Sequence, residues 1–115
     1  MKPTVYVVNK SYHDFSDARR YGPLVYLSEG KMSRYEPNKM AREFSAKLSE
    51  STEEDYLLLS GLSMMNLIAG ICFVLKHKRL NLLLFKNGRY LQRNLTFNSD
   101  EKIITDTEEH LDAHD

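Results

Sequence analysis

The sequence predicts a small single-domain α/β sandwich with a largely parallel sheet of about five strands, a C-terminal antiparallel hairpin and three helices. Short apolar runs with strand propensity alternate along the chain with helical patterns, and this alternation is typical of parallel strands joined by helices. The chain has 115 residues, which suffice for one hydrophobic core but not for two. We expect the domain to span residues 1–98, followed by an acidic, flexible tail over residues 99–115.

The predicted strands are short and mostly apolar. Residues 4–8 (TVYVV) are apolar at successive positions, which predicts a central strand covered on both faces. Residues 24–28 and 56–60 are further apolar runs with strand propensity. Residues 79–97 predict two strands joined at Asn87-Gly88, because this dipeptide most readily takes the positive φ angles of a type I′ turn.

Three helices are predicted between these strands. Asp14 can cap a short helix that ends before Pro23. Pro37 suits the first turn of an amphipathic helix that extends to about Glu50. The helix predicted over residues 63–77 is apolar almost all round, so it must be buried either in a deep core or against another subunit. In a domain this small we favour the second, a homo-oligomer interface.

Composition places the protein in an intracellular class. The single cysteine, Cys72, has no second cysteine with which to form a disulfide or a cysteine-based zinc site within one chain. The N-terminus lacks the apolar core of a signal peptide. The longest apolar stretch, residues 64–75, is shorter than the roughly 20 residues that a spanning helix needs. We therefore expect a cytoplasmic protein with no membrane segment.

The net charge of zero hides an asymmetry. From Asp100 onward there are seven acids against one base, which leaves 15 bases against 9 acids in the preceding body. A basic body with an acidic tail indicates an anionic partner for whose surface the tail competes. The alternative is a solvated body with a disordered, solubilising tail.

Polar residues follow the first and third predicted strands, at the sheet edge where α/β proteins bind ligands. Helix N-termini point free N–H groups at this edge, which favours anions. Gly61 would let the backbone approach a bound group, and Ser63 could cap a helix or donate to a phosphate, although both residue types are also ordinary at turns. The predicted ligand-binding residues are Asn9, His13, Asp14, Ser60, Gly61, Ser63 and Asn66.

No catalytic signature accompanies this candidate site. The sequence lacks the phosphate loop GxxxxGKS, the three-glycine dinucleotide fingerprint and the GxSxG nucleophile motif. His110 and His114 stand four residues apart near Asp112, but without the glutamate of an HExxH motif. We therefore predict no catalytic residue, no metal site and no cofactor.

A second candidate site is a basic edge on the predicted hairpin, formed by Lys86, Arg89 and Arg93 with Tyr90 between them. Such an edge can bind phosphate groups, although the spacing matches no nucleic-acid module. The alternative is that these charges protect an exposed strand from aggregation.

Three stretches read together carry a family resemblance: "VYVVNKSYHDFSDARRYGPLVYLSEG", "DYLLLSGLSMMN" and "RLNLLLFKNGRY". The chain resembles small hypothetical proteins encoded by bacteriophages and some bacteria, over about residues 4–95. The resemblance implies a phage origin, in which small single-domain proteins commonly bind and redirect a host component. It carries over no catalytic residue.

These observations lead to two functional hypotheses. The first is a small intracellular, phage-encoded binding protein, oligomeric through helix 63–77, that acts by stoichiometric contact with a host protein or nucleic acid in the host cytoplasm. The second is a nucleotide-binding or phosphate-binding protein, with or without hydrolytic activity, that uses the residues around Ser60-Gly61.

Overall fold

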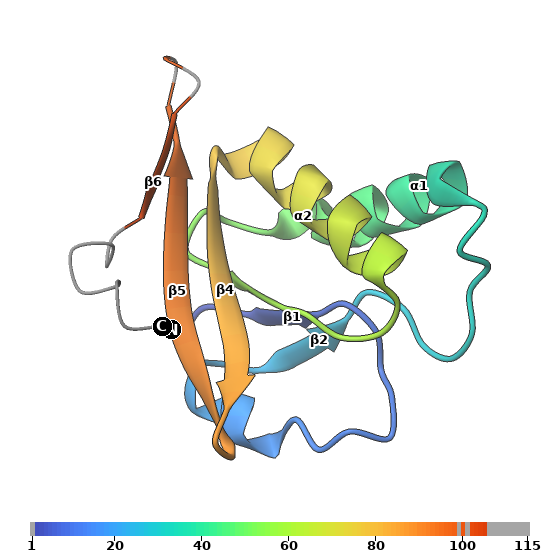
Figure 1. The fold of residues 1–115 in the computed structure, drawn as a ribbon, viewed down its shortest axis with the longest axis horizontal. Coiled ribbons are helices and arrows are strands. Elements are labelled where there is room, and N and C mark those ends of the chain that lie inside the picture. Colours follow the sequence, from blue (N-terminus) through green and yellow to red (C-terminus); the bar gives the residue numbers. More distant parts are fainter. Residues whose placement is uncertain (1, 99, 101, 106–115) are drawn as a thin grey trace.

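The computed structural model describes residues 2–98, 100 and 102–105. Six strands form one sheet in the order β2-β1-β3-β4-β5-β6, with two α-helices on one side of it (Figure 1). The elements are β1 (Val5–Val7), the 3₁₀ helix η1 (Ser16–Arg20), β2 (Leu24–Tyr26), α1 (Pro37–Lys47), the 3₁₀ helix η2 (Leu48–Glu50), β3 (Tyr56–Leu58), α2 (Ser63–His77), β4 (Arg79–Lys86), β5 (Arg89–Phe97) and β6 (Ile103–Thr105).

Strand β1 lies at the centre of the parallel half of the sheet, as predicted. It pairs in parallel with β2 on one side and β3 on the other, so that Tyr6 stands beside Val25 and Leu57. All three residues of β1 are buried. A continuous apolar run therefore marks the strand that is covered on both faces.

The predicted hairpin is also confirmed. Strands β4 and β5 pair antiparallel along their length, from Arg79 opposite Thr96 to Lys86 opposite Arg89. The connecting residues Asn87 and Gly88 have φ angles of 52° and 82°, as a type I′ turn requires.

The sheet is mixed, so the prediction of a largely parallel sheet of about five strands is wrong in two respects. Three strand pairings are parallel and two are antiparallel in the described part of the chain. A sixth strand, β6, pairs with β5 through Ile103 opposite Phe97 and Ile104 opposite Thr96. The mostly polar sequence of this segment predicts no stable structure, but the open edge of β5 offers backbone hydrogen bonds to any extended segment that reaches it. Residues 106–115 of the predicted flexible tail lie outside the described residues.

The described residues form two α-helices rather than three. The first predicted helix is the 3₁₀ helix η1, preceded by Asp14, whose carboxylate accepts a hydrogen bond from the Ser16 N–H at 2.8 Å. In a segment of five residues, the few hydrogen bonds of an α-helix do not offset the unfavourable free energy of forming its first turn. Helix α2 spans the predicted residues 63–77, and in the described part of the chain no helix is long and apolar enough to cross a membrane.

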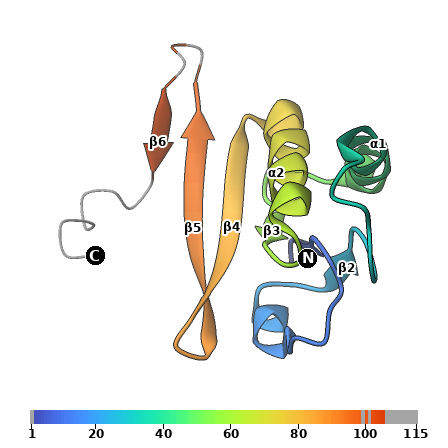
Figure 2. The same cartoon turned by 45° about the vertical axis from the view of Figure 1, so that its right-hand side comes forward.

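Two apolar clusters cover the two faces of the sheet. The helix-face cluster is formed by α1 and α2 against Tyr6, Val8 and Leu57. The cluster on the opposite face includes Phe15 and Ala18 of the η1 region, packed against β1, β3, β4 and β5. Both helices lie over the β2-β1-β3-β4 half, so that β5 and β6 project beyond them (Figure 2). This leaves an open corner between α2 and the hairpin.

Candidate functional site

The predicted ligand-binding residues Asn9 and Ser60 meet where β1 and β3 end. The Asn9 N–H donates to Ser60 Oγ at 2.9 Å, and the Ser60 hydroxyl donates to the Asn9 carbonyl oxygen at 2.8 Å. Only 8% of Asn9 is exposed. The pair therefore joins the ends of two neighbouring strands, and the Ser60 hydroxyl is occupied by this role.

Asn66 braces the turn between β3 and α2. Its Oδ1 accepts a hydrogen bond from the Ser60 N–H at 3.0 Å, and its Nδ2 donates to the Leu62 carbonyl oxygen at 3.1 Å. Both ends of the amide are thus bound within the turn. The arrangement explains why a polar residue stands inside an apolar helix.

The backbone conformation and the close packing at residue 61 require glycine. Its φ is +81°, and an added Cβ would lie 2.8 Å from Asn9 Cβ and 2.9 Å from Met65 Sδ. Ser63 does not cap α2: the N-cap residue is Leu62, and no side chain caps this helix within the described residues. The first N–H groups of α2 therefore remain open.

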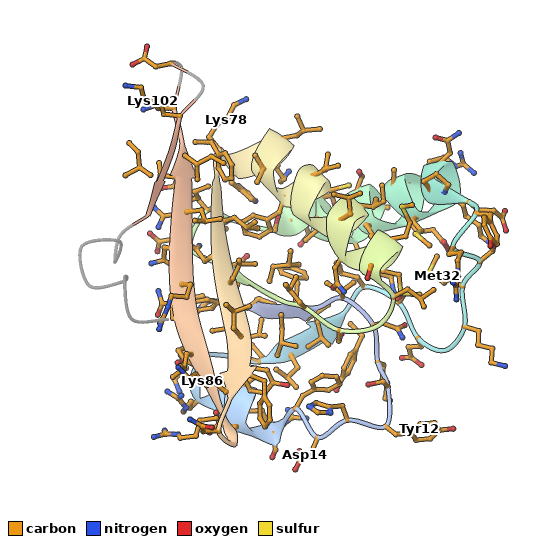
Figure 3. All side chains as sticks on the ribbon, in the orientation of Figure 1. Tyr12, Asp14, Met32, Lys78, Lys86 and Lys102 are labelled. Carbon is orange, nitrogen blue, oxygen red and sulfur yellow. The ribbon has the colours of Figure 1, made fainter. Side chains whose placement is uncertain are left out.

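His13 and Asp14 do not join this group. The His13 ring packs 5.4 Å from Phe85 and 5.5 Å from Phe15, between ring centroids, which places it with the cluster on the η1 face. Asp14 lies toward the hairpin (Figure 3), where its charge adds to burial in raising the pKa of Tyr90. The hydrogen bond from the Ser16 N–H lowers the pKa of the Asp14 carboxyl. The residues predicted as one site therefore separate into two places.

A pocket of about 480 Å³ lies beside Asn9 and Gly61. Its other walls are the first turn of α2 and the loop that follows β2. This loop, which is absent from the predicted site, brings Lys31, Arg34 and Tyr35 to the pocket. The signal was present, because the loop follows a strand that ends at the same edge of a parallel sheet.

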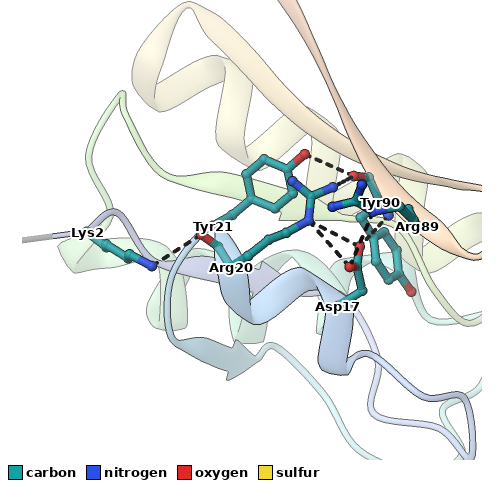
Figure 4. Close-up of polar contacts among 6 residues, drawn as sticks. All are labelled: Lys2, Asp17, Arg20, Tyr21, Arg89 and Tyr90. Atoms are coloured by element: carbon teal, nitrogen blue, oxygen red, sulfur yellow. Dashed lines mark hydrogen bonds and ion pairs between the residues drawn. The ribbon is translucent and has the colours of Figure 1, made fainter.

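The basic edge carries a counter-charge that the sequence analysis also missed. Asp17 of η1 accepts the Tyr90 N–H at 2.7 Å and lies 3.8 Å from Arg89 Nε (Figure 4). The hydrogen bond from Tyr90, together with Arg20 and Arg89, lowers the pKa of the Asp17 carboxyl.

The other two cations of the basic edge differ in their surroundings. Lys86 stands directly opposite Arg89 in the hairpin. Arg93 turns back along its own strand, where its Nη1 donates to the Gln92 carbonyl oxygen at 2.7 Å. The basic edge is therefore partly neutralised at Arg89, whereas neither Lys86 nor Arg93 forms an ion pair within the described residues.

Helix α2 carries an uncovered apolar surface. Leu67, Ile71 and Leu75 follow one another at four-residue spacing and are 58%, 47% and 70% exposed. We call these three residues the α2 stripe. The stripe forms one wall of an apolar groove of about 510 Å³, whose other lining residues include Leu57, Leu59, Asn66, Gly70, Val74, Leu80, Leu82 and Phe97. Apolar side chains so exposed and so close together mark an interaction surface.

No cluster of three or more potential metal ligands occurs among the described residues. The histidine pair His110 and His114 and the nearby Asp112 lie outside them.

Comparison with known families identifies the chain. Residues 3–111, almost the whole sequence, match the family described as Phage Pam3 gp32-like protein. The chain belongs to this family. The match confirms the resemblance to small phage proteins on which the sequence analysis relied. Searches of curated proteins and of solved structures each gave no match.

Proposed function

We propose that this member of the phage Pam3 gp32-like family is a binding protein that forms a homodimer through α2 and acts by stoichiometric contact with a host protein. The observation that carries the proposal is the α2 stripe with the apolar groove beside it. An exposed leucine-rich helix face in contact with water is costly, and a partner that covers it gains the free energy of apolar burial.

A second copy of the chain fits the α2 stripe. The three side chains follow one face of α2 and form one wall of the groove, so two copies related by a two-fold axis can lay their α2 stripes against each other. Nothing lies within 4 Å of the position of an added Gly70 Cβ, which leaves room for another backbone to approach. Helix α2 carries no acidic or basic residue before Lys76, so two stripes meet without repulsion of like charges.

We assign the contact with the host protein to the basic edge, which lies on the hairpin and not on α2. An acidic protein surface suits this edge better than a nucleic acid, because Asp17 already offsets Arg89 and a phosphate backbone needs several free cations. A triple variant with Lys86, Arg89 and Arg93 replaced by Ala should no longer retain the host protein that the wild type retains. Retention of nucleic acid in place of protein would contradict this part of the proposal.

The dimer is tested by sedimentation velocity at micromolar concentration with Ile71→Glu. The substitution places two carboxylates in the centre of the interface, and we expect at least a tenfold weaker dimer, equivalent to about 1.4 kcal/mol. Val25→Glu is the matched control, because Val25 is 40% exposed on the edge strand β2, away from α2. A wild type that sediments as a monomer, or an Ile71→Glu variant that dimerises as well as the control, would contradict the proposal.

Binding of a nucleotide or phosphate ligand remains a second candidate function. The observation in its favour is the pocket at the ends of β1 and β3. It occupies a different face from the α2 stripe, so the two functions can coexist and each can be tested alone. A location in the host cytoplasm remains a prediction from the sequence.

A further inference from the structure

The pocket beside Gly61 contains a buried amide with an unused polar atom. Asn9 Oδ1 lies 2.8 Å from Ser28 Oγ, and within the described part of the chain no hydrogen bond involves Asn9 Nδ2. The donor Nδ2, on a residue only 8% exposed, therefore lacks a partner.

This unpartnered atom faces the pocket. Asn9 lines the pocket, and its Nδ2 lies 3.3 Å from the position that a Gly61 Cβ would occupy. Burying a polar group without a partner is unfavourable, and a ligand that supplies the missing hydrogen bond removes this penalty. Gly61 keeps the approach to the amide open because it has no side chain.

The surroundings of the amide favour an anion. The N-terminus of α2 forms one wall of the pocket, with no side-chain cap among the described residues and no acidic residue in its first turn. The N–H groups of Ser63, Met64 and Met65 precede the first intrahelical bond of α2, which the Asn66 N–H donates to the Leu62 carbonyl oxygen. These groups and the helix dipole attract negative charge.

Two cations add to this field. Lys31 and Arg34 both line the pocket, and neither forms an ion pair within the described residues. The pocket walls include no aspartate or glutamate. The rest of the lining is largely apolar and comes from Met32, Tyr35, Leu62 and Met65.

The topology places the pocket where α/β sheets bind ligands. The chain leaves β1 toward β2 on one side and later returns to β3 on the other, so the connections diverge between β1 and β3. A crevice outside the carboxyl ends of the strands at such a point is the usual ligand site of an open α/β sheet. A volume of about 480 Å³ is also within the range of small-molecule sites, roughly 300–1,000 Å³.

We propose that this pocket binds a small phosphate-bearing ligand, with the phosphate held by the α2 N-terminus and the Asn9 amide and neutralised by Lys31 and Arg34. The inference deepens the second candidate function and replaces its residue set: Ser60 and Asn66 position the turn, His13 and Asp14 lie elsewhere, and Lys31 and Arg34 are added. The apolar wall around Met32 and Tyr35 contacts the remainder of the ligand.

The test measures the binding of pyrophosphate and AMP to the full chain at low salt. Titration calorimetry gives the affinity of each probe, and the NMR shifts of the backbone amides show where it binds. We expect both probes to bind and to shift the Ser63, Met64 and Met65 amides first. A Lys31→Ala/Arg34→Ala double variant should bind both probes at least about tenfold more weakly, because it removes both cations that line the pocket. Both residues are exposed, so this variant should keep the fold.

The matched control is a Lys39→Ala/Lys76→Ala double variant, which removes the same charge from exposed positions outside the pocket. Tighter binding of AMP than of pyrophosphate assigns the apolar wall to a nucleoside, and the reverse assigns the site to a bare phosphate group. Failure of both probes to bind, or equal affinity in the two double variants, would overturn the proposal. Neither result bears on the dimer, because no substituted residue belongs to the α2 stripe.

Discussion

Gly61 should tolerate alanine far less well than its exposed position suggests. Its φ of +81° lies in the left-handed region, where a residue with a Cβ costs about 1–2 kcal/mol. The added methyl group would also lie 2.8 Å from Asn9 Cβ, and relief of such overpacking typically costs about 1–3 kcal/mol. We expect Gly61→Ala to lower the free energy of unfolding by about 2–5 kcal/mol in total.

The measurement is urea unfolding followed by circular dichroism, with Gly30→Ala as the control. Gly30 has a similar φ of +72°, but nothing lies within 4 Å of its added Cβ, so it isolates the backbone cost. The loss of unfolded-state entropy is common to both substitutions and cancels in the comparison. Gly61→Ala should therefore be about 1–3 kcal/mol less stable than Gly30→Ala. Equal stability of the two variants would refute the close packing of Asn9 against the turn.

Two further predictions concern pH. Burial and the nearby Lys76 lower the pKa of His77 below its usual 6.5, so the unfolded chain binds this proton more readily than the folded chain, and the free energy of unfolding should fall as the pH drops below about 6.5. His77→Gln should reduce the change in the urea unfolding midpoint between about pH 7.5 and pH 5.5. An unchanged pH dependence in this variant would contradict the assignment. The Tyr90 N–H, with Arg20 and Arg89, holds the pKa of Asp17 below its usual 3.8, so the stability that the ionised carboxylate contributes is present above that value and lost as the pH falls through the lowered pKa. Asp17→Asn should therefore lose less stability than the wild type on acidification to below pH 3.8, and identical acid profiles would show that Asp17 does not anchor η1 to β5.

Most of the fold follows from local patterns in the sequence. The run TVYVV identifies the central strand, Asn87-Gly88 identifies the hairpin turn, and the apolar residues 63–77 identify α2 with its observed bounds. Strand β6 could not be recognised in this way, because three residues with polar neighbours become a strand only when the edge of β5 is available to pair with them. Its formation depends on tertiary context rather than on propensity.

The candidate site was predictable in position but not in composition. The parallel topology correctly brings Asn9 and Ser60 to one edge of the sheet. Sequence spacing does not reveal that the polar atoms of Ser60 and Asn66 are used in hydrogen bonds that hold the turn. Lys31 and Arg34 could not be placed because the loop over residues 27–36 has no period from which its path can be inferred. His13 was misplaced because its contacts with Phe15 and Phe85 depend on how the loop after β1 folds over the hairpin.

The central claim, that a second copy covers the α2 stripe, is tested most directly by cross-linking at its middle residue. Ile71→Cys in a Cys72→Ser background places one thiol at the centre of the stripe, and two-fold packing of α2 brings it next to its symmetry mate. Under mild oxidation the account predicts a disulfide-linked dimer in high yield for Ile71→Cys and a monomer for the control Val25→Cys in the same background. A monomer for both, or equal cross-linking of both, would contradict it.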